Sequence, residues 1–382
     1  MNNFTFQNPT KIIFGKGAIA SLATEIPQNK RVLITFGGGS VKSNGVYQQV
    51  CNALNNHTFF EFWGIEPNPT VETLRKAIEL GKVKNCDFIL AVGGGSVIDG
   101  SKLIASAINY QGDAWEIVMK RGYSSETILP LASVLTLPAT GSEMNAGAVI
   151  NNSSKREKFA FYSRYPLFSI LDPQVTYSLP DYQIANGLAD TFVHVTEQYL
   201  TTPDQSPLMD RWAEGILQTI LDIAPKILKD KTEYDSMATF MLSATMALNG
   251  FISMGVSEDW STHMIGHEIT ALTGLTHGHT LAIVLPGTMQ IMRHRKGDKI
   301  AQLGRRVFGI TAQERETAID KTIEATDNFF ISIGLPTKLS ENGIRTEVAE
   351  EIVERIKIRD SRFGENRDMD YTTVKDILNI RL

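Results

Sequence analysis

The chain has 382 residues, of which 42% are apolar and 21% charged, and its formal net charge at neutral pH is -5. This is the composition of an ordinary globular protein, and the length exceeds what one hydrophobic core usually supports, so we expect two domains. The chain has no excess of basic residues that would indicate a nucleic-acid partner, and no apolar run approaches the length that would span a bilayer.

The first half of the chain alternates β-rich runs with amphipathic helical stretches. We expect strands at residues 11–15, 31–36, 59–64, 88–92 and 132–137, with helices at 46–54, 71–83 and 97–108. Strands that alternate with helices indicate βαβ units and a largely parallel sheet. The run from Phe88 to Val92 is wholly apolar, as expected for a strand covered on both faces.

After about Pro180 the strand signals nearly vanish. Helical patterns follow at residues 184–200, 207–228, 234–250, 259–272, 312–333 and 346–356. The second half of the chain is therefore expected to be all-helical.

A glycine-rich turn, Gly93-Gly94-Gly95-Ser96, joins the strand at 88–92 to the helix that follows it. Glycines let a backbone approach a phosphate closely, and the free N–H groups and positive end of the helix favour a pyrophosphate. Ser96 with Asp99 also fits a short capping box, so a simple strand-to-helix turn is the alternative. The turn departs from the G-x-G-x-x-G fingerprint, because residue 98 is isoleucine, and it is not a P-loop.

A second glycine run, Gly37-Gly38-Gly39, follows the strand at 31–36 and precedes Ser40 and Lys42. The end of such a strand is where a nucleotide-binding sheet reads the adenosine ribose, and an acidic side chain there would repel a phosphate. Glycines, Ser40 and Lys42 leave room and donors for a phosphate, which favours NADP over NAD. A simple turn is again the alternative.

A third turn, from Thr136 to Glu143, is rich in hydroxyl groups. Thr136, Thr140 and Ser142 offer donors for the phosphates or the carboxamide of a nicotinamide cofactor. A loop capped by its own hydroxyls is the simpler reading of the same pattern.

Five of the seven histidines fall between positions 194 and 279, and His194 stands four residues after Asp190. Residues four apart share a helix face, so Asp190 and His194 are predicted to point at one spot. One carboxylate with several imidazoles suits a borderline divalent metal such as Zn²⁺ or Fe²⁺. The predicted ligands are Asp190, His194, His263 and His277.

The remaining histidines have other expected roles. His267 lies one turn beyond His263, where it would serve as a further imidazole ligand or a proton relay, and His279 is a weaker candidate. His57 and His294 are expected at the surface. The chain contains no H-E-x-x-H motif, because Ala271 stands where a zinc protease would need histidine.

Together these motifs resemble those of the iron-containing (group III) alcohol dehydrogenase family, from Asn8 to about residue 360. The matching segments are Gly93-Gly94-Gly95-Ser96 with Asp99, Pro138-Ala139-Thr140-Gly141-Ser142-Glu143, Gly187 with Asp190 and His194, and His263-Met264-Ile265-Gly266-His267-Glu268 with His277-Gly278-His279. The runs 37–42 and 64–69 are similar to those of the NADPH-dependent aldehyde reductase, or butanol-dehydrogenase-like, branch. The combination is specific, whereas no single segment would be.

The resemblance implies a dehydroquinate-synthase-like architecture. Residues 1–179 would form an α/β dinucleotide-binding domain with a mostly parallel sheet, and residues 180–382 an all-α domain for metal binding and catalysis. The family's ligand positions match the four residues chosen above from spacing, and His267 matches a position near the nicotinamide that is implicated in catalysis. NAD-preferring members have aspartate at the position of Gly39, so the glycine supports NADP(H).

Further positions follow from the turns and from the resemblance. Cofactor contacts are expected at Gly37, Gly38, Gly39, Ser40, Gly94, Gly95, Ser96, Asp99, Thr136, Thr140 and Ser142, and the resemblance adds Asn68, Lys158 and Leu179. Family members are usually homodimers. The first residues lack the blocks of a signal peptide, and Cys51 and Cys86 form no disulfide framework, so we expect a cytoplasmic protein.

The expected function is that of a metal-dependent NADP(H) alcohol dehydrogenase. It would reduce short- to medium-chain aldehydes to primary alcohols by hydride transfer, with Fe²⁺ or Zn²⁺ polarising the carbonyl. A dehydroquinate-synthase-like lyase that uses NAD and zinc is an alternative, although residues 250–280 lack the basic cluster that its phosphorylated substrate needs. A non-catalytic NADPH-binding protein and a metallohydrolase are further alternatives.

Overall fold

The structure is a computed structural model that describes residues 1–123, 127–203 and 205–382. The chain forms two compact units. The first comprises Gln7–Pro180 and Lys231–Thr245, and the second comprises Met1–Phe6, Asp181–Asp230 and Met246–Leu382. The domain boundary expected between residues 179 and 180 remains a prediction.

The first unit is built on a parallel sheet, as the alternation of strands and helices predicts. Its strands lie in the order β1 (Lys11–Phe14), β8 (Phe168–Leu171), β5 (Leu131–Leu135), β4 (Phe88–Gly93), β2 (Arg31–Phe36) and β3 (Thr58–Phe62). Every neighbouring pair is parallel, with Val32 opposite Phe88 and Ile89 opposite Leu131. The central strands β4 and β5 are buried along their whole length, which explains their unbroken apolar sequences.

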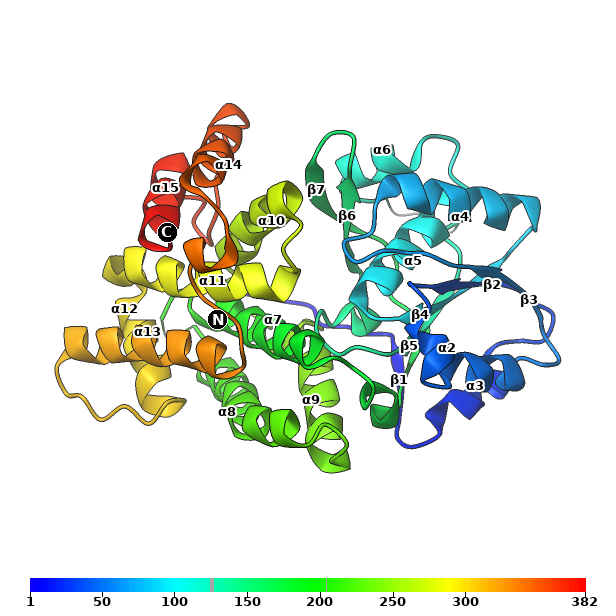
Figure 1. Ribbon diagram of the computed structural model, residues 1–382, viewed down its shortest axis with the longest axis horizontal. Helices are drawn as coiled ribbons and strands as arrows, with labels where there is room; N and C mark the ends of the chain where they lie inside the picture. Colours follow the sequence, from blue (N-terminus) through cyan, green and yellow to red (C-terminus); the bar gives the residue numbers. More distant parts are fainter. Residues whose placement is uncertain (124–126, 204) are drawn as a thin grey trace. The chain divides into compact units, whose positions relative to one another are not determined.

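Helices cover both faces of this sheet. One face packs against α4 (Val71–Val83), α5 (Gly95–Ala107) and α6 (Ala114–Met119), and the other against α1 (Leu22–Glu25), α2 (Ser40–Ser43) and α3 (Val46–Ala53) (Figure 1). An antiparallel hairpin of β6 (Gly147–Asn152) and β7 (Glu157–Tyr162) is an addition that the sequence did not predict. Helix α9 (Tyr234–Ala247) belongs mostly to this unit.

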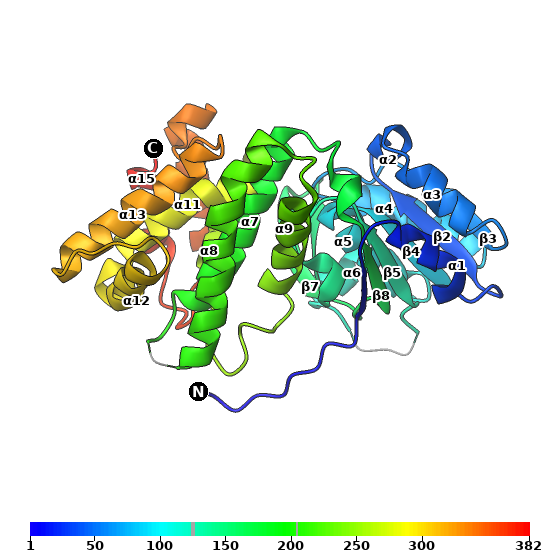
Figure 2. The same ribbon diagram turned by 90° about the horizontal axis from the view of Figure 1, so that it is seen from below.

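The second unit is helical, as expected. Its helices are α7 (Asp181–Tyr199), α8 (Pro207–Lys229), α10 (Ser261–Thr273), α11 (His277–Ile291), α12 (Arg293–Arg306), α13 (Arg315–Ser332), α14 (Thr346–Ile358) and α15 (Tyr371–Ile380). Helices α7 and α8 run side by side (Figure 2). Helix α11 packs against α7, α10, α13 and α15, and is buried from Gly278 to Met289. In the part of the chain that the structure describes, no helix is long and apolar enough to cross a membrane.

Candidate metal centre and cofactor-binding turns

One face of α7 organises the candidate metal centre. Asn186, Asp190, His194 and Glu197 follow one another at spacings of three or four residues, so they form a stripe along the helix. Asp190, His194 and Glu197 are each at least 97% buried. Buried polar groups need partners, and the stripe finds them on the two helices α10 and α11.

At one end of the stripe, Asn186 caps helix α11. Its Oδ1 accepts hydrogen bonds from the backbone N–H of His279 at 2.8 Å and from the hydroxyl of Thr276 at 2.7 Å. Helix α11 approaches α7 so closely that a Cβ on Gly278 would lie 2.2 Å from the carbonyl oxygen of Asn186. The glycine between the two histidines therefore lets α11 bring His277 up to α7.

At the other end of the stripe, Glu197 caps helix α10. Its carboxylate accepts hydrogen bonds from the backbone N–H groups of Thr262 at 2.5 Å and His263 at 3.3 Å. The same carboxylate also hydrogen-bonds Nδ1 of the His263 side chain. With Nδ1 occupied by Glu197, the other ring nitrogen of His263 is the one that can bind a metal.

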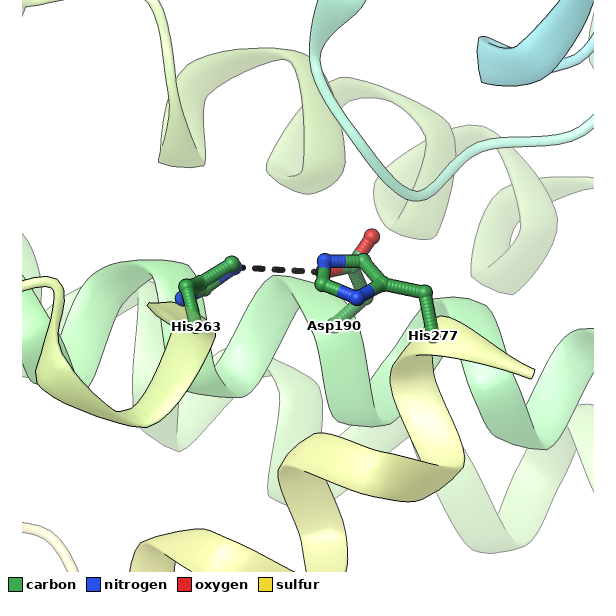
Figure 3. Close-up of side chains that lie close together, drawn as sticks. All are labelled: Asp190, His263 and His277. Carbon is green, nitrogen blue, oxygen red and sulfur yellow. Dashed lines mark ion pairs between the residues drawn. The ribbon is translucent and has the colours of Figure 1, made fainter. Parts of the chain in front are cut away.

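Three imidazole nitrogens gather around one oxygen of Asp190. Its Oδ1 lies 3.5 Å from His194 Nδ1, 3.7 Å from His263 Nε2 and 3.9 Å from His277 Nε2. Figure 3 shows Asp190, His263 and His277 pointing toward one another from α7, α10 and α11. The structure thus brings together side chains that are up to 87 positions apart, counting from Asp190 to His277.

These separations suit a divalent metal. With ligand bonds of about 2.0–2.1 Å, the donor atoms of a tetrahedral site lie about 3.4 Å apart. Donor atoms of Asp190, His263 and His277 all lie within 4.8 Å of one another. His194 is outside that group of three, although its Nδ1 is the nitrogen nearest to Asp190 and its ring stacks on His263 with centroids 4.6 Å apart. Assignment of all four as ligands remains a prediction.

Burial and charge act differently on the two stacked imidazoles. Burial lowers the pKa of His194 to about 4, so this ring is neutral near pH 7, as a metal ligand must be. Burial also opposes a charge on His263, but Glu197 and Asp190 outweigh it and raise its pKa to about 9. The carboxylates of Glu197 and Asp190 therefore stabilise a positive charge beside His263 in the second unit.

The structure separates His267 from His279. His267 is 6% exposed, and its ring centroid lies 5.1 Å from that of His277, so it borders the candidate centre. His279 is turned away from it, because Nε2 bonds the carbonyl oxygen of Pro336 at 2.9 Å and Nδ1 bonds the hydroxyl of Tyr182 at 3.3 Å. Both ring nitrogens of His279 thus have partners outside the candidate centre.

Three residues expected at the cofactor form one chain of contacts in the first unit. The Nζ of Lys158 donates to the Oδ1 of Asn68 at 2.9 Å, and the backbone N–H of Asn68 donates to the hydroxyl of Ser96 at 3.3 Å. Asn68 has a left-handed backbone with φ 56°, which asparagine tolerates better than most residues. The start of α5, the start of β7 and the loop after β3 are thereby joined.

Asp99 has a different partner from the one that the capping-box reading predicts. Its Oδ1 accepts from the hydroxyl of Ser142 at 2.6 Å and its Oδ2 from the backbone N–H of Val149 at 2.9 Å. Helix α5 is capped at Gly94 without a side-chain hydrogen bond, and Ser96 lies inside it. The capping box is therefore wrong: with Gly94 as the N-cap, Asp99 lies two residues beyond the position that a capping box requires, and it binds Ser142 and Val149 instead.

The buried ammonium of Lys102 completes this network. Its Nζ donates to Ser142 Oγ at 2.7 Å, to Asn145 Oδ1 at 3.1 Å and to the carbonyl oxygen of Gly147 at 2.6 Å. Burial lowers the pKa of Lys102 to about 8 and raises that of Asp99, while each charge partly offsets the effect on the other. The network fixes the loop that contains the predicted cofactor residue Ser142.

The two glycine runs differ in their surroundings. A Cβ on Gly94 would lie 3.1 Å from Leu137, and a Cβ on Gly95 would lie 2.3 Å from the hydroxyl oxygen of Thr140. Close packing is thus sufficient to explain these two glycines. A Cβ on Gly38 or Gly39 would meet no atom within 4 Å, so the first run presents open backbone that a nucleotide can approach.

The other expected cofactor residues are placed by their backbone or hydroxyl groups. The backbone N–H of Thr136 bonds Gly93 at 3.0 Å, which holds the end of β5 beside the turn after β4. Thr140 Oγ1 accepts from the backbone N–H of Ser142 at 3.3 Å. The carbonyl oxygen of Leu179 accepts from Lys231 at 2.9 Å. Their contacts to a cofactor remain predictions.

Asn186, Glu197 and Lys102 belong to these networks but stand outside the motifs recognised in the sequence. Glu197 had a usable signal, since it stands seven residues after Asp190 and three after His194 and therefore shares their helix face. Asn186 had the same signal, four residues before Asp190. Lys102 had none, because a lysine in a helix is ordinarily assigned to the surface.

Comparison with known proteins identifies the family. Residues 9–173 match the model of the iron-containing alcohol dehydrogenases, and residues 184–381 match the model of the C-terminal region of the same family. The chain belongs to the iron-containing alcohol dehydrogenase family. This confirms the resemblance inferred from the motifs, and with it the oxidoreductase class.

Individual proteins are also similar along the whole chain. The NADPH-dependent aldehyde reductase YqhD of Escherichia coli (strain K12) is 49% identical over 374 residues, with 97% of each chain covered. The crystal structure of E. coli K-12 YqhD has a TM-score of 0.98 at 47% identity, covering 100% of this chain and 99% of that one. NADH-dependent butanol dehydrogenase A of Thermotoga maritima has a TM-score of 0.95 at 34% identity, with 100% and 99% coverage. The fold expected from the sequence is thereby confirmed.

Proposed function

We propose that this member of the iron-containing alcohol dehydrogenase family is a metal-dependent NADP(H) enzyme that reduces short- to medium-chain aldehydes to primary alcohols. The observation that carries the proposal is the buried convergence of three imidazole nitrogens on one oxygen of Asp190, at 3.5, 3.7 and 3.9 Å. A structural role for these side chains would not require such a concentration of donors around one point.

The residues proposed to hold the metal are Asp190, His194, His263 and His277. When bound there, a divalent ion such as Fe²⁺ or Zn²⁺ supplies Lewis acidity toward a carbonyl oxygen, and a bound nicotinamide supplies hydride. Glu197 holds the ring of His263 through Nδ1 and so leaves Nε2 directed at the centre.

Proton supply is the role proposed for His267. Its ring borders that of His277, and reduction of a carbonyl to an alcohol consumes one proton in addition to the hydride. Imidazole exchanges protons near neutral pH, so a ring nitrogen of His267 can deliver this proton directly or through a water.

The choice of NADP(H) rests on the turn after β2. Named relatives differ in cofactor, since YqhD is described as NADPH-dependent and the butanol dehydrogenase of T. maritima as NADH-dependent. Here Gly39 has no carboxylate to repel a 2′-phosphate, and Gly38 and Gly39 face open space. Asn68, Ser96, Asp99, Ser142 and Lys158 are proposed to contact the cofactor as well.

The first experiment follows NADPH absorbance with butyraldehyde as substrate. Enzyme stripped by chelation is compared with enzyme refilled with Fe²⁺ or with Zn²⁺, and NADH is tested in parallel. Restored oxidation of NADPH, with NADH much slower, is the expected result. Tight NADPH binding without turnover in any metal form would overturn the proposal and favour a binding protein or a lyase that regenerates its cofactor.

A His263→Ala variant tests the metal assignment separately. It should lose bound metal and activity together, because it removes one of the converging nitrogens. Full activity in a metal-free His263→Ala protein would end the metal-dependent proposal.

We also propose that the protein is a cytoplasmic homodimer. Homodimers are usual in the family, and light scattering of the purified protein would test the dimeric state.

A further inference from the structure

A lysine and two stacked aromatic rings meet at the carboxyl end of β2. The rings of Phe36 and Trp63 are stacked, with centroids 4.0 Å apart and planes at 12°. The Nζ of Lys42 lies 4.0 Å from the Trp63 centroid and 5.7 Å from that of Tyr47. Because Phe36 already covers one face of the indole, the ammonium must occupy the other.

Phe36 holds the indole of Trp63 at one face, and Glu61 holds it at its edge. Phe36 is fully buried, so its ring is a fixed base for the stack. The Nε1–H of Trp63 donates to one oxygen of the Glu61 carboxylate at 2.8 Å, and the hydroxyl of Tyr47 donates to the other at 2.9 Å. Both carboxylate oxygens therefore face ring donors, and Trp63 offers a rigid platform for the lysine.

This platform adjoins the open glycine turn. The backbone N–H groups of Gly64 and Ile65 donate to the carbonyl oxygens of Gly37 at 3.2 Å and Phe36 at 3.1 Å. The segment that contains Trp63 is thus bonded to the turn that precedes Lys42. In a nucleotide-binding sheet, this is the position at which the ribose 2′ substituent of the cofactor is read.

We propose that Trp63 is a positioning residue that holds the ammonium of Lys42 for the 2′-phosphate of NADP(H). This inference rests on the cofactor choice in the proposed function. Lys42 is an exposed lysine, and a free lysine side chain loses much rotational freedom when it binds an anion. The indole face restrains the side chain beforehand, and the N–H donors directed away from the ring remain for phosphate oxygens.

The same arrangement also binds the carboxylate of Glu61. A carboxylate near a 2′-phosphate would repel it, and Glu61 lies on the adjacent strand β3. Its two oxygens bind Trp63 and Tyr47, so its charge is partly neutralised by hydrogen bonds. Replacement of Trp63 would remove the platform for Lys42 and one of these donors at once.

Calorimetric titration of the full-length protein tests the proposal without any need for turnover. The probes are 2′,5′-ADP, which contains the 2′-phosphate, and 5′-ADP, which lacks it. Trp63→Leu should weaken 2′,5′-ADP binding about 2- to 5-fold, the effect of one exposed cation–π contact. Lys42→Met should weaken it about 10-fold through loss of a charge-assisted hydrogen bond. Neither change should alter 5′-ADP binding.

Conservative and double variants distinguish positioning from a general effect on folding. Trp63→Phe, which keeps an aromatic face, should retain most of the 2′,5′-ADP affinity. In the Lys42→Met background, Trp63→Leu should add little, because only its hydrogen bond to Glu61 would then be lost. Lys84→Met is the matched control, since Lys84 lies 5.5 Å from the Phe60 ring but adjoins Arg31 at the amino end of β2.

Two results would overturn the inference. Equal weakening of both probes by Trp63→Leu, or additive effects of the two substitutions, would mean that Trp63 does not act through Lys42. If the unaltered protein itself binds 2′,5′-ADP no better than 5′-ADP, the choice of NADP(H) in the proposed function fails, and this inference fails with it.

Discussion

The carboxylate of Glu197 binds both the backbone N–H and the side-chain Nδ1 of His263. One carboxylate therefore fixes the start of α10 and the orientation of a candidate metal ligand on it. Glu197 stands on the same face of α7 as Asp190, so a single helix carries candidate ligands and also aligns a candidate ligand on another helix.

Replacement of Glu197 by Gln should weaken metal binding. The amide keeps the side-chain size but loses the charge and one acceptor, and loss of such an outer contact typically lowers metal affinity 10- to 100-fold. Competition with a chromogenic chelator measures the Zn²⁺ dissociation constant directly. Glu214→Gln is the control, because that buried carboxylate binds Tyr199 and Arg306 instead. Unchanged affinity in Glu197→Gln would show that Glu197 only caps the helix.

His277 and His279 offer a matched pair two residues apart. His277→Gln should remove most of the bound metal, because its Nε2 is one of the nitrogens around Asp190. His279→Gln should leave the metal content unchanged and lower the free energy of unfolding by about 1 kcal/mol, since it weakens the hydrogen bond to Pro336. Metal content by mass spectrometry and thermal unfolding separate the two effects. Metal loss in His279→Gln would contradict this assignment.

The two glycine runs should respond oppositely to alanine. At Gly95 a Cβ would meet Thr140 at 2.3 Å, so Gly95→Ala should destabilise the protein by about 1–3 kcal/mol through overpacking. At Gly38 a Cβ meets nothing within 4 Å, so Gly38→Ala should leave stability unchanged and weaken NADPH binding instead. Unfolding midpoints and NADPH fluorescence titrations provide the comparison. Full NADPH affinity in Gly38→Ala would argue that this turn is only structural.

Much of the fold could be predicted because its signals are local. The expected strand at 31–36 and the helix at 71–83 have the bounds observed for β2 and α4. Helix α11 could not be predicted in this way. It is buried on all sides, so it has no amphipathic period. It also contains Pro286 and Gly287, which are typical helix breakers, and such a prediction depends on both signals.

The candidate ligands could be predicted because their residue types are rare and clustered. What the sequence could not indicate was how three helices meet there. The approach of α11 to α7 requires a glycine at position 278, because a side chain there would clash with α7. The alignment of α10 depends on Glu197, two turns beyond Asp190. These contacts are long-range, and the residues that make them are of common types.

Lys102 leads to a prediction about pH. In the folded protein burial lowers its pKa from the usual 10.5 to about 8, whereas in the unfolded chain the pKa returns to its usual value. Between pH 8 and 10.5 the unfolded state therefore holds a proton that the folded state has lost, so this residue makes the free energy of unfolding rise with pH in that window. The rise would be about 3 kcal/mol at most.

Lys102→Met isolates this contribution because it removes the titrating group. The variant should be less stable than the unaltered protein at pH 8, since Ser142, Asn145 and Gly147 lose a buried donor. The stability gap between the two proteins should then widen toward pH 10, as the lysine of the unaltered protein becomes neutral when folded. Urea unfolding midpoints at pH 7, 8, 9 and 10 measure the gap. Parallel curves for the two proteins would mean that Lys102 keeps its charge in the folded state throughout this range.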